Sequence, residues 1–290
     1  METLRSALQP LTQSLPAPIV DTGRSLLGPY CYKTLILDID PFTSPECLKL
    51  AVSKALGIGI IGASSIVKIP QLLKLLNSQS AAGISFLAYL LESGAYLISL
   101  SYNVRHGFPF STYGETALIL VQNVVIAALV LRYSGQNAAV AAWVGGLAAA
   151  GAALFREDIV DVRMLAWLQA GAGVLGVLSK VPQIATIWAE GGTGQLSAFA
   201  VVNYLLGSLS RIFTTLQEVP DPLILYGFIA GFALNAVLFL QVVWYWNSPT
   251  GKKTGAKKVN KPVGAAKADG TSSSTSYASK AKSPSTRRRG

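Results

Sequence analysis

The sequence predicts an all-α membrane protein with seven transmembrane helices, arranged as two parallel three-helix repeats joined by a linker helix. Composition and an internal repeat lead to this prediction. Of the 290 residues, 51% are hydrophobic and only 13% are charged, and the mean hydropathy is +0.45. One soluble core could not enclose so much apolar surface, so we expect a lipid bilayer to surround most of the chain.

Seven apolar windows are long enough to cross a bilayer, which takes roughly 20 mostly apolar residues per helix. They lie near residues 48–68, 84–102, 113–132, 137–155, 164–188, 196–216 and 222–246. The fourth window is rich in Ala and Gly and contains no polar anchor. We therefore expect it to be the linker between two units of three helices.

A tetrapeptide, Lys-x-Pro-Gln, occurs twice, at residues 68–71 and 180–183, a shift of 112 residues (180 − 68). Two further pairs share this shift: Ile84-Ser85 with Leu196-Ser197, and Asn123 with Asn235. Three matches at one offset, each in or beside an apolar window, indicate a duplication. Because each unit has an odd number of helices, the linker gives the second unit the orientation of the first, and the repeats are parallel.

The duplication divides the chain into five segments. They are a lumenal N-terminal segment (1–47), the first repeat (48–135), the linker helix (136–163), the second repeat (164–247) and a basic tail (248–290). The tail holds eleven Lys and Arg residues and one acid, Asp269, so it carries the whole net charge of +10 (11 − 1). We expect it to be disordered and cytosolic, with the N-terminus in the lumen. The neutral body offers no basic groove for nucleic acid.

Cysteine and histidine are scarce. Cys31, Cys47 and His106 are too few for a disulfide framework or a zinc cluster, so we expect no metal and no cofactor. Asp38-Ile39-Asp40 resembles the Asp-x-Asp pair of many glycosyltransferases, but the short segment around it leaves no room for a nucleotide-binding sheet. No Ser-His-Asp set can be built around a single histidine. We therefore predict that the protein is not an enzyme.

The two Pro-Gln pairs, Pro70-Gln71 and Pro182-Gln183, are the first candidates for a site. Proline removes a backbone donor and frees a carbonyl, and glutamine adds both a donor and an acceptor. In lipid such groups must be satisfied inside the protein or by water in a cavity. The duplication favours two breaks that line one central cavity. The alternative is that each proline only ends a helix in a loop.

Polar residues inside the apolar windows supply further candidates. Glu92 lies on a stripe of helical spacing, and Arg211 or Lys180 could pair with it; a structural hydrogen bond between helices is the alternative. Glu115 and Gln122 share a helix face. The full set of binding or cavity candidates is Lys68, Pro70, Gln71, Glu92, Glu115, Gln122, Asn123, Lys180, Pro182, Gln183, Asn203, Arg211 and Asn235.

The paired Pro-Gln motifs resemble the PQ-loop family, which includes SWEET-like sugar carriers and lysosomal amino-acid exporters. Five segments, the first Pro-Gln motif among them, resemble a narrower family, named for mannose-P-dolichol utilization defect, over about residues 48–247. We call them the signature segments: residues 68–71, 108–115, 192–197, 211–214 and 217–222.

The narrower resemblance implies a multi-pass protein of the endoplasmic reticulum membrane. Such a protein would be needed when mannose-P-dolichol and glucose-P-dolichol donate sugars to N-glycan precursors, GPI anchors and mannosylated proteins. Its expected partners are these dolichol-phosphate sugars, the bilayer and lumenal glycosyltransferases, with Lys68, Lys180 and Arg211 as candidate phosphate contacts. The alternative is a PQ-loop transporter of small solutes such as sugars or amino acids.

Overall fold

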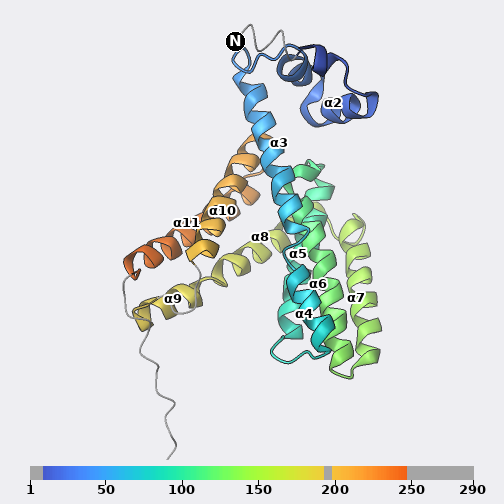
Figure 1. Ribbon diagram of the computed structural model, residues 1–290. Helices are drawn as coiled ribbons and strands as arrows, with labels where there is room; N and C mark the ends of the chain where they lie inside the picture. Colours follow the sequence, from blue (N-terminus) through green and yellow to red (C-terminus); the bar gives the residue numbers. More distant parts are fainter. Residues whose placement is uncertain (1–8, 193–197, 247–290) are drawn as a thin grey trace, which may run out of the picture. The chain divides into compact units, whose positions relative to one another are not determined.

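The computed structural model describes residues 9–192 and 198–246, all of which lie in a contact unit formed by residues 1–252. The described residues form helices and connections and contain no strand (Figure 1). Each predicted window is occupied by helix. The basic tail lies outside the described residues, so its predicted disorder and cytosolic location remain predictions.

Six helices or broken helices are long and apolar enough to cross a membrane, counted over the described residues. Two of them are broken: α3 (Pro45–Ser64) continues into α4 (Ile69–Ser78), and α8 (Val162–Leu178) continues into α9 (Val181–Glu190). The other four are α6 (Gly114–Tyr133), α7 (Asn137–Phe155), α10 (Ala198–Glu218) and α11 (Pro222–Trp244). Helix α5 (Phe86–Arg105) has 20 residues but is not among the six, because residues such as Glu92 and Asn103 lower its hydropathy.

Both helix breaks follow from the Lys-x-Pro-Gln motif. The lysine occupies the N-cap position of α4 and of α9, without a capping bond from its side chain. The proline lies in the first turn, where its missing N–H costs no helical hydrogen bond. Each of these helices has ten residues and ends in a left-handed residue, Gln79 (φ 47°) or Gly191 (φ 63°). Those two residues are also 112 apart (191 − 79), so the duplication extends to the helix ends.

Three hydrophobic clusters hold the helices together. Leu75, Ile126 and Trp143 belong to a cluster within the first repeat and α7, and Ile187 and Leu238 belong to a cluster within the second repeat. The third cluster contains residues of both repeats and α7: Leu97, Tyr102, Leu120, Leu154, Val160, Leu165, Val219 and Ile224. We call the end of the helices that carries Lys68 and Lys180 the Pro-Gln end. Each repeat thus has its own small core towards the Pro-Gln end, and the shared core lies towards the opposite end.

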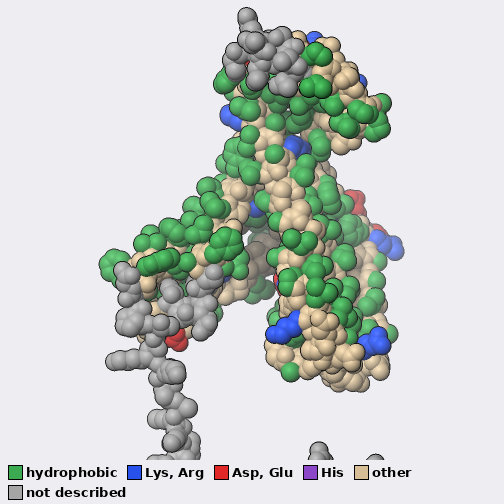
Figure 2. Space-filling model, in the orientation of Figure 1, with side chains coloured by type: hydrophobic (Ala, Val, Ile, Leu, Met, Phe, Trp, Pro, Cys, Tyr) green, Lys and Arg blue, Asp and Glu red, His purple; other side chains and the backbone are tan. Residues whose placement is uncertain are grey.

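Much of the remaining surface is apolar. Hydrophobic side chains cover the outward faces of the helices in Figure 2, and only 6–39% of each candidate span is buried. A soluble protein rarely exposes such continuous apolar surface, whereas lipid-facing helices must. This confirms the prediction of a multi-pass membrane protein.

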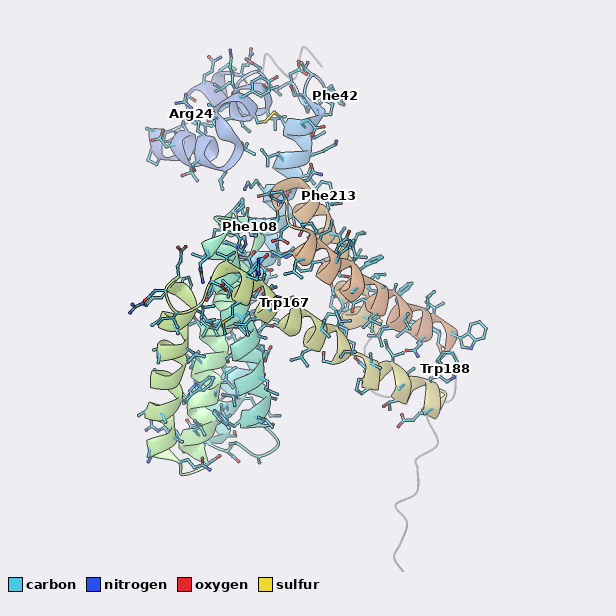
Figure 3. All side chains as sticks on the ribbon, turned by 180° about the vertical axis from the view of Figure 1, so that it is seen from behind. Arg24, Phe42, Phe108, Trp167, Trp188 and Phe213 are labelled. Carbon is cyan, nitrogen blue, oxygen red and sulfur yellow. A yellow bond between two sulfur atoms is a disulfide. The ribbon has the colours of Figure 1, made fainter. Side chains whose placement is uncertain are left out.

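The N-terminal segment contains one disulfide, which the sequence analysis did not predict. Helix α2 (Ala17–Tyr32) leads into a π-helical turn (Lys33–Leu37), and Cys31 forms a disulfide with Cys47 at the start of α3 (Figure 3). Two cysteines cannot form a framework, but one bridge needs only two, and the turn brings their Cα atoms to 5.1 Å. Because disulfides persist in oxidising compartments, the bridge favours the predicted lumenal N-terminus. We call this end of the helices the disulfide end.

The disulfide gives a direct test. The chain contains two cysteines, so the full-length protein taken from membranes without reductant should gain no mass from a polyethylene-glycol maleimide under denaturing conditions. After reduction it should gain two adducts. The Cys31→Ser variant should gain one adduct without reduction, because Cys47 has then lost its partner. Two adducts on unreduced wild-type protein would contradict the bridge.

Candidate functional site

The first Pro-Gln break is closed by polar contacts from two helices. In a continuous helix the N–H of residue 68 would bond the carbonyl of residue 64. Here the Gln122 amide from α6 replaces that bond: its Oε1 accepts from the Lys68 N–H (3.0 Å) and its Nε2 donates to the Ser64 carbonyl (2.9 Å). The freed backbone groups are therefore satisfied inside the protein, as lipid requires.

The Lys68 side chain is neutralised at the same place. Its ammonium lies 3.1 Å from both carboxylate oxygens of Glu92 on α5 and 5.3 Å from the ring centre of Tyr89. The side chains are 21% and 35% exposed, so the ion pair is partly open to its surroundings. The first repeat thus holds a cation and an anion that compensate each other.

The second break has a different set of partners. Lys180 donates to the Oδ1 of Asn235 on α11 and lies 5.5 Å from the ring centre of Tyr204 on α10. Asn235 in turn donates to the Tyr204 carbonyl (3.0 Å) and to the Ser208 hydroxyl (3.1 Å). By the 112-residue shift, Tyr204 stands where Glu92 stands in the first repeat. Lys180 therefore has no carboxylate within 4.0 Å among the described residues.

A buried ion network lies towards the disulfide end. Glu218 at the end of α10 pairs with Lys54 of α3 and accepts from the hydroxyls of Ser53 and Ser111. Lys54 also donates to the Ser111 hydroxyl at 3.0 Å. The Glu218 and Lys54 side chains are 2% and 13% exposed, so the two charges are removed from solvent together.

A second ion pair extends the network. Arg211 of α10 pairs with Glu115 of α6, and its guanidinium donates to the Thr112 carbonyl at 3.0 Å. These side chains are 7% and 16% exposed. We use the term ion network for Lys54, Glu115, Arg211 and Glu218 with the Ser53 and Ser111 hydroxyls. Its two cations and two anions balance, and it joins α3 and α6 of the first repeat to α10 of the second.

Comparison with known proteins agrees with this duplicated arrangement. Residues 52–112 and 164–224 each match the PQ loop repeat, and the matched blocks are again 112 residues apart (164 − 52). The chain is thus similar to PQ-loop proteins over these two segments. It is also similar to human solute carrier family 66 member 3, with 26% identity over 186 residues that cover 64% of this chain and 90% of that protein. No solved structure matches.

Several sequence-based pairings are corrected by the structure. Glu92 pairs with Lys68 of its own repeat and not with Lys180 or Arg211. Arg211 pairs with Glu115, and the pair of Glu218 with Lys54 is buried. These pairs depend on how each helix is rotated about its own axis. The residue pattern within one helix does not show which neighbouring helix each polar face meets.

The remaining candidates are placed as follows. Asn203 is exposed and donates to the Phe199 carbonyl of its own helix, so it does not join Arg211. Asn123 is fully buried, and its amide has no partner among the described residues. Gln71 is partly buried, while Pro70, Pro182 and Gln183 are exposed. Whether the two Pro-Gln pairs line one cavity remains a prediction.

The sequence reasoning missed Lys54, Ser53 and Ser111. One signal was present, because Lys54 is a charged residue inside the first apolar window. The serines gave no such signal, since hydroxyls are common in transmembrane helices. Only the fold shows that both hydroxyls point at the carboxylate of Glu218.

The ion network predicts a large stability effect. Glu218→Gln keeps the shape but leaves Lys54 buried without its carboxylate, and breaking a buried pair in this way costs about 3–5 kcal/mol. The matched control is Glu46→Gln in the exposed Lys49–Glu46 pair of α3, the helix that also carries Lys54. This change should cost about 1 kcal/mol or less. Thermal unfolding in detergent should separate the two variants. Equal unfolding temperatures would show that the network does not stabilise the fold.

Proposed function

We propose that this protein acts in the endoplasmic reticulum membrane, where it allows mannose-P-dolichol and glucose-P-dolichol to serve as sugar donors. The pathways served are those of N-glycan precursors, GPI anchors and protein mannosylation. The protein itself transfers no sugar. It presents or redistributes the lipid to lumenal glycosyltransferases. Helix α5 crosses the bilayer as a seventh span, so that the two ends of the chain lie on opposite sides of the membrane.

One observation carries this proposal: three of the five signature segments, residues 108–115, 211–214 and 217–222, converge on the ion network. Ser111, Thr112 and Glu115 come from residues 108–115, Arg211 from 211–214 and Glu218 from 217–222. Phe108 and Phe213 of these segments are labelled in Figure 3. These three segments of the narrower resemblance therefore build one buried structure.

The chemistry of the proposed ligand fits the Pro-Gln end. A dolichol-phosphate sugar carries one negative charge at its head, and its isoprenoid can stay in the bilayer. Lys68 and Arg211 are already paired with carboxylates, whereas Lys180 bonds only the neutral amide of Asn235 among the described residues. Lys180 is thus the best placed of the three predicted phosphate contacts, because a ligand anion can bind there without having to displace a carboxylate.

A second candidate function is transport of a small solute. It is favoured by the similarity to human solute carrier family 66 member 3, whose name identifies it as a solute carrier. Lys180 beside Asn235 and the Tyr204 ring would then serve a soluble anion. The two functions differ in the ligand: a dolichol-phosphate sugar keeps its isoprenoid chain in the bilayer, whereas a small solute has no membrane anchor.

A deletion strain separates the two functions. We expect its lipid-linked oligosaccharides to stop at the stage that needs lumenal mannosyl donors, with normal synthesis of mannose-P-dolichol itself. Purified protein in liposomes should take up neither sugars nor amino acids. Full-length oligosaccharides in the deletion strain together with uptake in liposomes would favour the transporter.

Lys180 and Lys68 should respond differently to loss of charge. Lys180→Gln keeps a hydrogen bond to Asn235 but removes the cation, so donor use should fall about tenfold at normal protein abundance, equivalent to about 1.4 kcal/mol of binding. Lys68→Gln should instead lower abundance by leaving Glu92 unpaired, and adding Glu92→Gln should restore it. Lipid-linked oligosaccharide profiles and immunoblots of the complemented deletion strain give both readouts. Full complementation by Lys180→Gln would exclude its role in phosphate binding.

A further inference from the structure

A cavity of about 480 Å³ lies at the disulfide end, between α2, α3 and the loop before α6. Five of its eight lining residues are apolar: Leu26, Ile58, Ile61, Pro109 and Phe110. The other three are Ser25, Lys54 and Ser111, and the last two belong to the ion network. The cavity is therefore mainly apolar, and Lys54 and Ser111, which bond each other, form its polar end.

The polar end retains capacity to bind an anion. A lysine ammonium has three donors, and Lys54 uses two of them, on Ser111 and on Glu218, among the described residues. The third donor can bond a ligand oxygen while the Lys54–Glu218 pair stays intact, so no carboxylate has to be displaced. Phosphate oxygens accept strong hydrogen bonds from such a cation.

The walls of the cavity are held in place by close packing and by the disulfide. At Gly57 on α3, a Cβ atom would clash with the Ser111 carbonyl oxygen, so only glycine lets the loop approach α3 this closely. The Cys31–Cys47 bridge ties the end of α2 to the start of α3. Tyr30 and Ser44 add a hydrogen bond of 3.0 Å between their hydroxyls.

We infer that this cavity binds the head end of a polyisoprenyl phosphate, with the phosphate at Lys54 and the first isoprene units against Ile58, Ile61, Phe110 and Leu26. The inference rests on the proposed function and specifies a binding site for its lipid at the disulfide end. A free sugar would leave its hydroxyls unpaired against these apolar walls, which is costly. An amphiphile with one anionic head matches both parts of the cavity.

Photolabelling tests this site directly. The probe is a short polyisoprenyl phosphate with a diazirine in its first isoprene unit, used on purified full-length protein in lipid nanodiscs. Label should appear in peptides that contain Ile58 or Phe110, and dolichyl phosphate should compete for it whereas mannose 1-phosphate should not. Label confined to other peptides, or equal competition by mannose 1-phosphate, would overturn the inference.

Filling the cavity supplies the matched variants. Ile58→Trp should lower labelling about tenfold, a loss of about 1.4 kcal/mol. Val52→Trp, on the same helix but outside the cavity lining, should label like wild type. Because Ile58→Trp could unfold the bundle, Leu26→Trp fills the cavity from α2 and is measured beside it, each with its thermal unfolding. Unchanged labelling in folded Ile58→Trp and Leu26→Trp proteins would also overturn the inference.

The same variants separate this site from the function itself. If the deletion strain shows the oligosaccharide defect but folded Ile58→Trp protein repairs it fully without labelling in the cavity, the site is wrong and the proposed function stands. If the deletion strain shows no defect while the cavity is still labelled with the expected competition, the proposed function is wrong and the site remains as a lipid site.

Discussion

The structure depends on one constraint: polar groups at membrane depth must find partners within the protein. Proline breaks two helices and frees backbone groups at each break. At the first break the Gln122 side chain takes the place of the missing helical bond. At the second, the Lys180 N–H bonds the Val177 carbonyl one residue closer than in an α-helix. The same constraint explains why the charges of the ion network lie together, since each would be costly alone.

The duplication allows one half of the molecule to be compared with the other. Lys68 and Lys180 occupy equivalent positions, but Glu92 and Gln122 of the first repeat correspond to Tyr204 and Leu234 of the second. The first break is therefore closed by charge pairing and an amide bridge, and the second is left with a cation on a neutral amide and a ring. A symmetric pair of breaks would have given two equivalent sites. The difference between the repeats points to a structural role for the first break and a binding role for the second.

Sequence reasoning reached the helices, the repeat and the breaks, because these depend on hydropathy and on proline, which are local properties. It did not reach the ion pairs. Glu115 and Arg211 were both identified as candidates, yet their pairing depends on which faces of α6 and α10 meet. The disulfide was missed because counting cysteines says nothing about the turn that brings Cys31 to Cys47. Hydropathy also underrates α5, whose polar residues contact other parts of the protein: Glu92 pairs with Lys68, and Tyr102 donates to Asp221.

The two ends of the bundle differ in how their charges are balanced, and this bears on how a charged lipid could be handled. At the Pro-Gln end each repeat packs around its own core, and Lys180 has no carboxylate partner among the described residues. At the disulfide end the shared core and the ion network hold the repeats together with balanced charge. A head group could therefore approach Lys180 without separating the repeats. At the disulfide end it could reach Lys54 only from the cavity beside α2, since Glu218 and Arg211 are enclosed. Access from the side, along α3, suits a ligand whose chain never leaves the bilayer.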